Sequence, residues 1–279
     1  MEKILLAIDG ISIDMPTLDF ACYMAKLTGS KLTGVFLENL VANERSVFKS
    51  VHGIPSYESE IDTDSPELVE KNKIIERNIQ LFKDACEKRS TPCTVHCDRG
   101  VPANEIISES RYADLVIVDA DTSFNKRFEG TPTEFVKDVL KDSECPVIIA
   151  PEVFEGINEI IFTYDASKSA AFAIKQFSYL LPQFEDKKIT ILQVNKQGEW
   201  KDIDKYNLWE WLHDRYSAIG FVALEGESTD RLFAYLFQKR NVFIVMGAYS
   251  RSALSRFLKH SHADLLMRTI TQPIFISHY

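Results

Sequence analysis

Two aspartates close two apolar runs of the chain, and their positions are typical of a ligand site. Asp9 follows residues 4–8, and Asp165 follows residues 160–164. Short apolar runs of this kind predict buried strands, and in an open parallel sheet ligands bind beyond the carboxyl ends of strands, where the strand order reverses. A carboxylate at that point accepts hydrogen bonds from a base or a ribose, or it caps the following helix. Both roles stay open for both aspartates.

The groups expected to face these aspartates come from residues 119–134 and 247–261, which follow two later apolar runs. Asp9 then lies near Asp119, and two such carboxylates raise each other's pKa or hold a cation. A solvent-filled cleft that has lost its ligand is the interpretation that we favour. The sequence contains no Gly-x-Ser-x-Gly turn and no P-loop ending in Lys-Ser/Thr, so we expect no enzymatic activity.

A metal site is not expected. Cys93, His96 and Cys97 are of types that bind zinc, but side chains alternate along a strand, so the two cysteines share one face and the histidine points to the other. No second Cys pair with zinc spacing follows. We therefore expect buried thiols in a strand. For His260 and Ser261, helix capping by the serine or an anion contact is favoured over a metal site.

These residues are positioned by a pattern of elements that occurs twice. Each half of the chain contains five short apolar runs separated by stretches with apolar residues at helical spacing, which predicts βαβ crossovers and a largely parallel sheet. The fold class is therefore α/β, as two repeated flavodoxin-like or Rossmann-like domains, each a five-stranded mainly parallel sheet with helices on both faces. The expected strands cover residues 4–8, 32–37, 95–100, 115–118 and 145–149 in the first half and 160–164, 189–194, 221–226, 242–245 and 272–276 in the second.

The two expected domains span residues 1–151 and 156–279, and they differ by an insertion. The segment before the third strand is about 30 residues longer in the first domain, which places an acidic insertion at about residues 39–66. An acidic segment with two prolines is usually a solvated loop. A lid or an arm that docks a partner is the alternative.

The chain has 279 residues and a formal charge of −9, and the acidic excess lies in one half. Residues 1–150 contain 17 Lys and Arg against 26 Asp and Glu, whereas residues 151–279 contain 15 of each. Net acidity argues against nucleic acid and anionic membranes as partners. No run approaches the ~20 apolar residues of a membrane helix, and five irregularly spaced cysteines are typical of reduced thiols. We expect a cytoplasmic protein with no membrane or nucleic-acid partner.

Ordered motifs recur in both halves. The first half contains ILLAIDG, the strand end Gly100-Val101-Pro102, ADLVIVDA and ECPVIIAPE; the second contains INEIIFTYDAS, FIVMGAYSRSALSRFLKHSHADLL and TQPIFI. Along nearly its whole length the chain therefore resembles the universal stress protein family. The resemblance implies a tandem member with one α/β domain in each half, and cytoplasmic, stress-linked expression. It also implies a site that binds ATP in some members of the family and not in others.

ATP-binding members of that family carry Gly, two residues, Gly, nine residues, Gly and then Ser or Thr after the fourth strand. Backbone N–H groups approach the phosphates closely at such glycines. The matching positions of the second half hold Gly247, Ser250, His260 and Ser261. Those of the first half hold Asp119, Thr122 and Pro132, with Gly130 and Thr131 slightly out of register. One glycine of three remains in the second half, and an acidic side chain replaces it in the first.

Charge separates the two loops further, because residues 119–134 have a net charge of −2 and residues 250–262 a net charge of +3. We expect a degenerate site in the first half, closed to ATP and made of Asp9, Asp119, Thr122, Gly130 and Thr131. No cofactor is assigned firmly, and a site for ATP, another adenine nucleotide or a different anion stays open in the second half. Its candidate residues are Asp165, Gly247, Ser250, Arg251, His260 and Ser261. A solvated basic face explains the same charges equally well.

The leading hypothesis is a non-enzymatic regulatory or protective protein whose halves pair as an intramolecular pseudo-dimer. The family resemblance places the contact between the two halves, which we call the seam, at the fifth strands, residues 146–149 and 273–276. The alternative is a nucleotide-binding switch, or a weak ATPase, that uses only the second half. A third interpretation is an adaptor whose insertion recruits a basic protein partner. Further association into a homodimer stays open.

Overall fold

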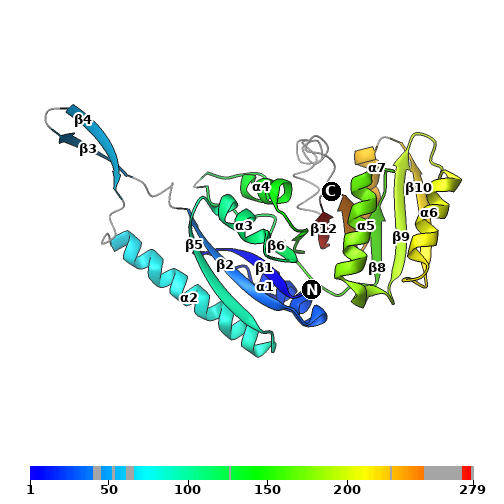
Figure 1. Cartoon of the computed structure of the whole chain (residues 1–279), viewed down its shortest axis with the longest axis horizontal. Coiled ribbons are helices and arrows are strands. Elements are labelled where there is room, and N and C mark those ends of the chain that lie inside the picture. Colours follow the sequence, from blue (N-terminus) through cyan, green and yellow to red (C-terminus); the bar gives the residue numbers. More distant parts are fainter. Residues whose placement is uncertain are drawn as a thin grey trace.

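One sheet of ten strands runs through the molecule, with helices on both of its faces (Figure 1). The computed structural model describes residues 1–39, 45–51, 54–60, 66–125, 127–226, 228–247 and 272–277. The strand order is β10-β9-β8-β11-β12-β7-β6-β1-β2-β5. A separate two-stranded sheet is formed by β3 and β4.

The elements follow the expected alternation of strands and helices. The first half contains β1 (Lys3–Asp9), α1 (Met15–Thr28), β2 (Lys31–Asn39), β3 (Arg45–Val51), β4 (Ile54–Glu60), α2 (Pro66–Lys88), β5 (Cys93–Gly100), α3 (Pro102–Ser110), β6 (Leu115–Val118), α4 (Glu134–Asp142) and β7 (Val147–Ile149). The second contains β8 (Glu159–Thr163), α5 (Lys168–Leu180), a short 3₁₀ helix (Pro182–Phe184), β9 (Lys188–Asn195), α6 (Asp202–Leu212), β10 (Ile219–Glu225), α7 (Ser228–Phe237), β11 (Val242–Gly247) and β12 (Ile274–Ser277).

Each half has the same strand order, with its own third, second, first, fourth and fifth strands in succession across the sheet. This is the order of the Rossmann fold, and it reverses between the first and fourth strands. β1 pairs in parallel with β6, and β8 pairs in parallel with β11. The expected α/β fold class is confirmed, and the two switch points lie at the carboxyl ends of these strand pairs.

The sheet is buried on both faces, which explains why its strands read as nearly continuous apolar runs. In β1, Ile4 and Leu6 face one cluster of buried side chains, whereas Leu5 and Ala7 face the other. Helices α1, α2, α5 and α6 contribute to the first cluster, and α3, α4 and α7 contribute to the second. Each half thus has helices on both faces of its five strands.

The halves join through their fifth strands. β7 and β12 pair antiparallel, with Val147 opposite Ile276, Ile148 opposite Phe275 and Ile149 opposite Ile274. All six side chains are buried. The pairing gives each half a neighbour for a strand that would otherwise be an open edge, which is the liability that edge strands carry. The seam inferred from the family resemblance is therefore confirmed.

The insertion is not the solvated loop that its acidity predicted. Residues 45–51 and 54–60 form an antiparallel hairpin, β3–β4, which projects from the first half beyond the start of α2 (Figure 1). β-branched and aromatic residues such as Val47, Phe48 and Val51 favour strands. Our prediction gave more weight to the acidic composition of the segment than to this preference. Part of the length difference between the two halves comes from the helix before the third strand, because α2 has 23 residues and the matching α6 has 11.

The thiols of β5 depart from expectation, because Cys97 is exposed and Cys93 is only partly buried. β5 is the edge of the sheet, so its side chains have a neighbouring strand on one side only. The alternation of faces is as predicted. Cys93 packs against the cluster that contains α1 and α2, and the Nδ1 atom of His96 lies 2.5 Å from the Oε1 atom of Glu109 in α3.

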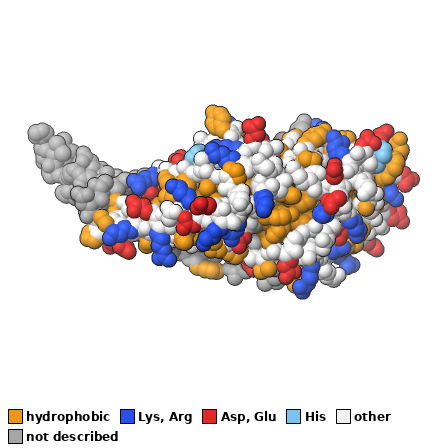
Figure 2. Space-filling model, turned by 90° about the horizontal axis from the view of Figure 1, so that it is seen from below, with side chains coloured by type: hydrophobic (Ala, Val, Ile, Leu, Met, Phe, Trp, Pro, Cys, Tyr) orange, Lys and Arg blue, Asp and Glu red, His pale blue; other side chains and the backbone are white. Residues whose placement is uncertain are grey.

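Acidic and basic side chains are interspersed on the face of the molecule shown in Figure 2, so the acidic excess forms no continuous patch among the coloured side chains of that face. Within the described ranges, no helix combines the length and the apolar character needed to cross a membrane.

Candidate functional site

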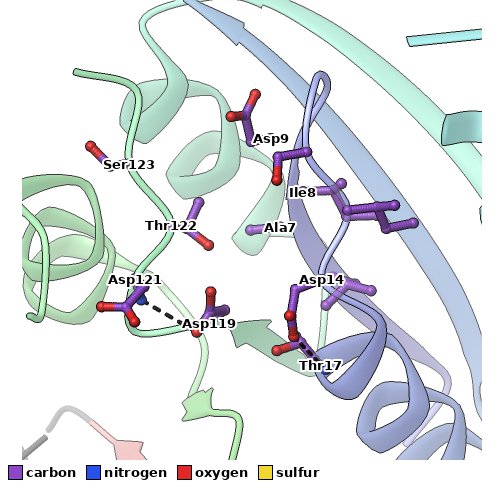
Figure 3. Close-up of a pocket in the computed structure, with 12 residues that line it drawn as sticks. Ala7, Ile8, Asp9, Asp14, Thr17, Asp119, Asp121, Thr122 and Ser123 are labelled. Atoms are coloured by element: carbon purple, nitrogen blue, oxygen red, sulfur yellow. Dashed lines mark hydrogen bonds between the residues drawn. The ribbon is translucent and has the colours of Figure 1, made fainter. Parts of the chain in front are cut away.

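A cavity of about 170 Å³ lies at the switch point of the first half, at the carboxyl ends of β1 and β6 (Figure 3). Its walls come from β1, from the loop that leads into α1, from the first turn of α1 and from the segment after β6. The side chains with polar groups around it are those of Asp9, Ser12, Asp14, Thr17, Asp119, Asp121, Thr122 and Ser123.

Asp9 and Asp14 shape the loop between β1 and α1. An oxygen of the Asp9 carboxylate accepts a hydrogen bond from the Ile11 backbone N–H at 3.2 Å, which ties down the turn after the strand. Asp14 is the residue that caps α1, because its Oδ2 accepts the Thr17 N–H at 2.8 Å. Burial raises the pKa of Asp9, and the Ile11 N–H and the charge of Lys71 oppose this only in part.

Asp119 and Asp121 come from the segment after β6. The Oδ1 atom of Asp119 accepts the Asp121 N–H at 3.3 Å, and its carbonyl accepts the Thr122 N–H at 3.2 Å. The pKa of Asp119 is raised to about 6, mainly by burial and also by the charges of Asp14, Asp121 and Glu152, against the opposing effect of the Asp121 N–H. The Asp119 carboxylate is thus held among like charges.

No Lys or Arg is among the described residues that line this cavity, so its four aspartates have no cationic partner in the wall. Lys71 acts on Asp9 from α2, but the Lys71 Nζ atom lies 3.4 Å from the carboxylate of Glu38. In Figure 3, Asp14 and Thr17 lie on one side of the cavity, with Asp119 and Asp121 opposite. The site is therefore a pocket of uncompensated negative charge.

Thr17 adds a hydroxyl to the wall. Only 5% of this residue is exposed, and its side chain lines the cavity. The Thr17 backbone N–H is used by the Asp14 cap, whereas its hydroxyl has no hydrogen-bond partner among the described residues.

The structure brings Asp9, Asp119 and Thr122 of the predicted degenerate site together around the cavity. Gly130 and Thr131 are not part of its lining, although the Thr131 hydroxyl donates a hydrogen bond to Asp121. Sequence reasoning missed five polar residues of the lining, namely Ser12, Asp14, Thr17, Asp121 and Ser123. A signal for Asp14 was present, because an Asp two residues before a proline is typical of a helix start.

The switch point of the second half is built differently. Asp165 is exposed, and its Oδ1 accepts the Ser167 N–H at 3.0 Å, while the Ser167 hydroxyl caps α5. Gly247 lies at the end of β11 directly against the first turn of α5, where an added Cβ would be 2.4 Å from the Ser169 carbonyl carbon. Close packing of a helix on the strand end therefore explains this glycine. The other candidates, Ser250, Arg251, His260 and Ser261, lie outside the described residues.

No protein-family model and no curated protein matches the sequence. Among solved structures, a universal stress protein from Archaeoglobus fulgidus DSM 4304 is similar over 99% of this chain and 98% of its own, with a TM-score of 0.68 and 16% identity. The chain has the fold of a tandem universal stress protein. A functionally unknown protein from Pseudomonas aeruginosa PAO1 shares this universal stress protein fold, with a TM-score of 0.62 and 12% identity over 100% of this chain and 92% of its own. The resemblance to the universal stress proteins inferred from the sequence is confirmed for the fold.

Proposed function

We propose that the chain is a non-enzymatic regulatory or protective protein of the universal stress type, whose first half does not bind nucleotides. The observation that supports this best is the ring of four aspartates at the first switch point, with no basic side chain among its described lining residues. Two like charges 4 Å apart repel by about 4 kcal/mol at the effective dielectric of a protein surface. A nucleotide phosphate placed there would meet several such charges.

Three backbone N–H groups at this cavity already donate to its aspartates. Phosphate sites rely on free N–H groups at helix starts and turns. Here the N–H groups of Ile11, Thr17 and Asp121 donate to the aspartates of the site itself. The carboxylates thus occupy the donors that phosphate oxygens would need, and an adenine nucleotide does not fit the first half.

Any binding of an adenine nucleotide then belongs to the second half. Gly247 stands at the position that Asp119 has in the first half, because the fourth strand pairs with the first strand in the same register in both halves. The basic charge of residues 250–262 in the sequence favours an anion there. A partner protein or small molecule that carries the regulatory signal remains part of the proposal, as does a cytoplasmic location.

Calorimetric titration with ATP, ADP and AMP tests this assignment. We expect any saturable heat to be unchanged in Asp119→Asn and lost in a chain that carries Arg251→Glu, Arg256→Glu and Lys259→Glu. The same samples should release no phosphate from ATP. Nucleotide binding that survives the triple substitution would contradict the proposal, and so would steady phosphate release by the wild-type chain.

A further inference from the structure

We infer that the first half contains a thiol site that reacts with a hydroperoxide and ends as a disulfide between Cys22 and Cys86. Cys93 is the thiol that the oxidant meets first. This site goes beyond the proposed function and does not depend on it, because none of the three cysteines lines the cavity at the first switch point.

Cys22 and Cys86 bring two sulfur atoms into contact in the interior of the first half. Cys22 lies on α1 and Cys86 near the end of α2, and their Sγ atoms are 3.9 Å apart. Both residues are buried, with at most 1% of either exposed, and both belong to one apolar cluster. A disulfide has an S–S length of about 2.05 Å. The sulfur atoms therefore have less than ~2 Å to close between two helices that already pack together.

The environment of Cys22 favours the thiolate, which is the form of cysteine that attacks another sulfur. Its hydrogen bond with Cys86 lowers the pKa of the Cys22 thiol, against the opposing effect of burial. The Thr91 hydroxyl and the charge of Arg89 lower this pKa further. The same hydrogen bond raises the pKa of the Cys86 thiol. Cys86 is thus the S–H donor of the pair, and Cys22 is the nucleophile.

Thr91 is an observation that does not depend on the distance between the sulfur atoms. Only 6% of this residue is exposed, and its buried Oγ1 atom has no hydrogen-bond partner of normal geometry among the described residues. Buried hydroxyls are normally paired, because leaving one unpaired costs free energy. A thiolate at Cys22 would accept from this hydroxyl. A charge that forms on Cys22 therefore explains a polar residue at this position.

Cys93 connects the buried pair to the surface. It is partly buried on β5, the edge strand of the sheet, and packs against the same apolar cluster as Cys22 and Cys86. A tight turn joins β5 to the end of α2, where the Thr91 N–H donates to the Cys86 carbonyl at 2.9 Å. After the larger effects of Cys22 and burial, the Cys93 thiol also raises the pKa of Cys86. An oxidant that reaches Cys93 therefore has Cys86 as the neighbouring sulfur.

The reaction balances with two thiols as the reductant and a hydroperoxide, ROOH, as the oxidant. The Cys93 sulfur attacks the terminal oxygen, the O–O bond breaks, and the products are a sulfenic acid and the alcohol ROH. The Cys86 sulfur then attacks the Cys93 sulfur, and its proton leaves with the hydroxyl group as water. Finally the Cys22 thiolate attacks the Cys86 sulfur, and Cys93 leaves as a thiolate that takes up the proton lost by Cys22.

The two other cysteines lack these features. Desolvation and the charges of Asp98 and Glu38 raise the pKa of Cys97, although this residue is exposed. Cys145 is buried in the cluster on the other face of the sheet, and its pKa is raised to about 12, mainly by burial. Both thus favour the thiol form, which is the less reactive one.

Peptide mapping of the full-length chain without reductant tests the site. The reduced chain, shown by circular dichroism to be folded, is treated with hydrogen peroxide and then unfolded in N-ethylmaleimide, which blocks the remaining thiols. We expect maleimide on three of the five cysteines and one cross-linked pair of peptides, which contains Cys22 and Cys86. Dithiothreitol before the block should restore all five thiols.

Cys93→Ser and Cys97→Ser form a matched pair of variants, because they remove thiols from the same face of the same strand. We expect Cys93→Ser to slow formation of the disulfide about tenfold or more, since the oxidant then has to reach a buried sulfur. Cys97→Ser should leave the rate unchanged. In Cys22→Ala the final exchange is blocked, so a disulfide between Cys86 and Cys93 should accumulate.

Any of three results would overturn this site. The first is a peroxide-treated chain in which Cys97 is oxidised while Cys22 and Cys86 both remain available to maleimide. The second is an equal rate of disulfide formation in Cys93→Ser and Cys97→Ser. The third is a bond between Cys22 and Cys86 that forms only at denaturant concentrations that unfold the chain, which would show that the folded protein shields these thiols.

Discussion

The two switch points occupy equivalent places in the same topology, but the helix that follows the first strand begins closer to the strand end in the second half than in the first. In the first half, five positions separate Asp9 from the helix cap Asp14, whereas two separate Asp165 from the cap Ser167. With the shorter loop, α5 begins over the strand end and its first turn contacts Gly247. The length of this loop thus sets how closely the following helix approaches the end of the fourth strand.

The residue at the carboxyl end of the fourth strand also differs between the two halves. Asp119 lines an open cavity and is surrounded by like charges, whereas the matching Gly247 has a helix against it where a side chain would be. The glycine that sequence comparison within the chain suggested as a phosphate contact is required by packing. A glycine in a sequence motif therefore has to be judged by the atoms that an added side chain would contact.

The largest expected effect is at the second switch point, where α5 packs against Gly247. Gly247→Ala places a Cβ 2.4 Å from the backbone carbon of Ser169, and backbone atoms yield only by moving the helix. We expect the free energy of unfolding to fall by about 3 kcal/mol or more, as for severe overpacking. Chemical denaturation measures this directly.

Gly220→Ala is the matched control, because a Cβ there would have its nearest neighbour, the Ile189 carbonyl oxygen, at 3.7 Å. It should change the free energy of unfolding by less than about 0.5 kcal/mol. Equal stability of the two variants would show that α5 does not pack against Gly247 in this way.

A smaller effect on the free energy of unfolding is expected at the first switch point, and it depends on pH. The pKa of Asp119 is raised to about 6 in the folded chain from an ordinary value of 3.8, so the folded state holds this proton more tightly than the unfolded state. The stability that the proton provides is present below about pH 4 and is lost as the pH rises to about 6. Asp119→Asn has no such loss. Relative to wild type it should gain about 1–3 kcal/mol above pH 6 and nothing near pH 4.

Thermal or chemical unfolding of both chains between pH 4 and pH 8 measures that difference. Asp138→Asn, on the exposed surface of α4, should follow the wild-type curve. If the difference between Asp119→Asn and wild type were constant across this range, the aspartate would not be under the electrostatic strain that distinguishes the two halves.

The strands and their repetition could be predicted from the sequence because buried parallel strands are continuous apolar runs. The seam was inferred from the resemblance, and the meeting of Asp9 and Asp119 followed from the topology, since both stand just beyond paired strands at a switch point. These features depend on short-range patterns or on rules of connection. They needed no knowledge of side-chain packing.

Other features depended on distances that sequence patterns do not encode. The position of Thr17 in the cavity wall follows from where α1 begins, and the need for glycine at position 247 follows from the close approach of α5. The exposure of Cys97 follows from the place of β5 at the sheet edge. The hairpin β3–β4 was missed because its acidic composition was given more weight than the propensity of its apolar residues for strands.

The first switch point is a pocket of negative charge with no cation among its described lining residues, and the pKa of Asp119 measures this most directly. Carboxyl ¹³C chemical shifts of an Asp-labelled chain, followed from pH 3 to pH 9 and assigned with Asp119→Asn, give that value. The account predicts a pKa of about 6. A pKa at or below the ordinary value of 3.8 would contradict it, because it would mean that cationic or hydrogen-bonding groups already compensate this carboxylate.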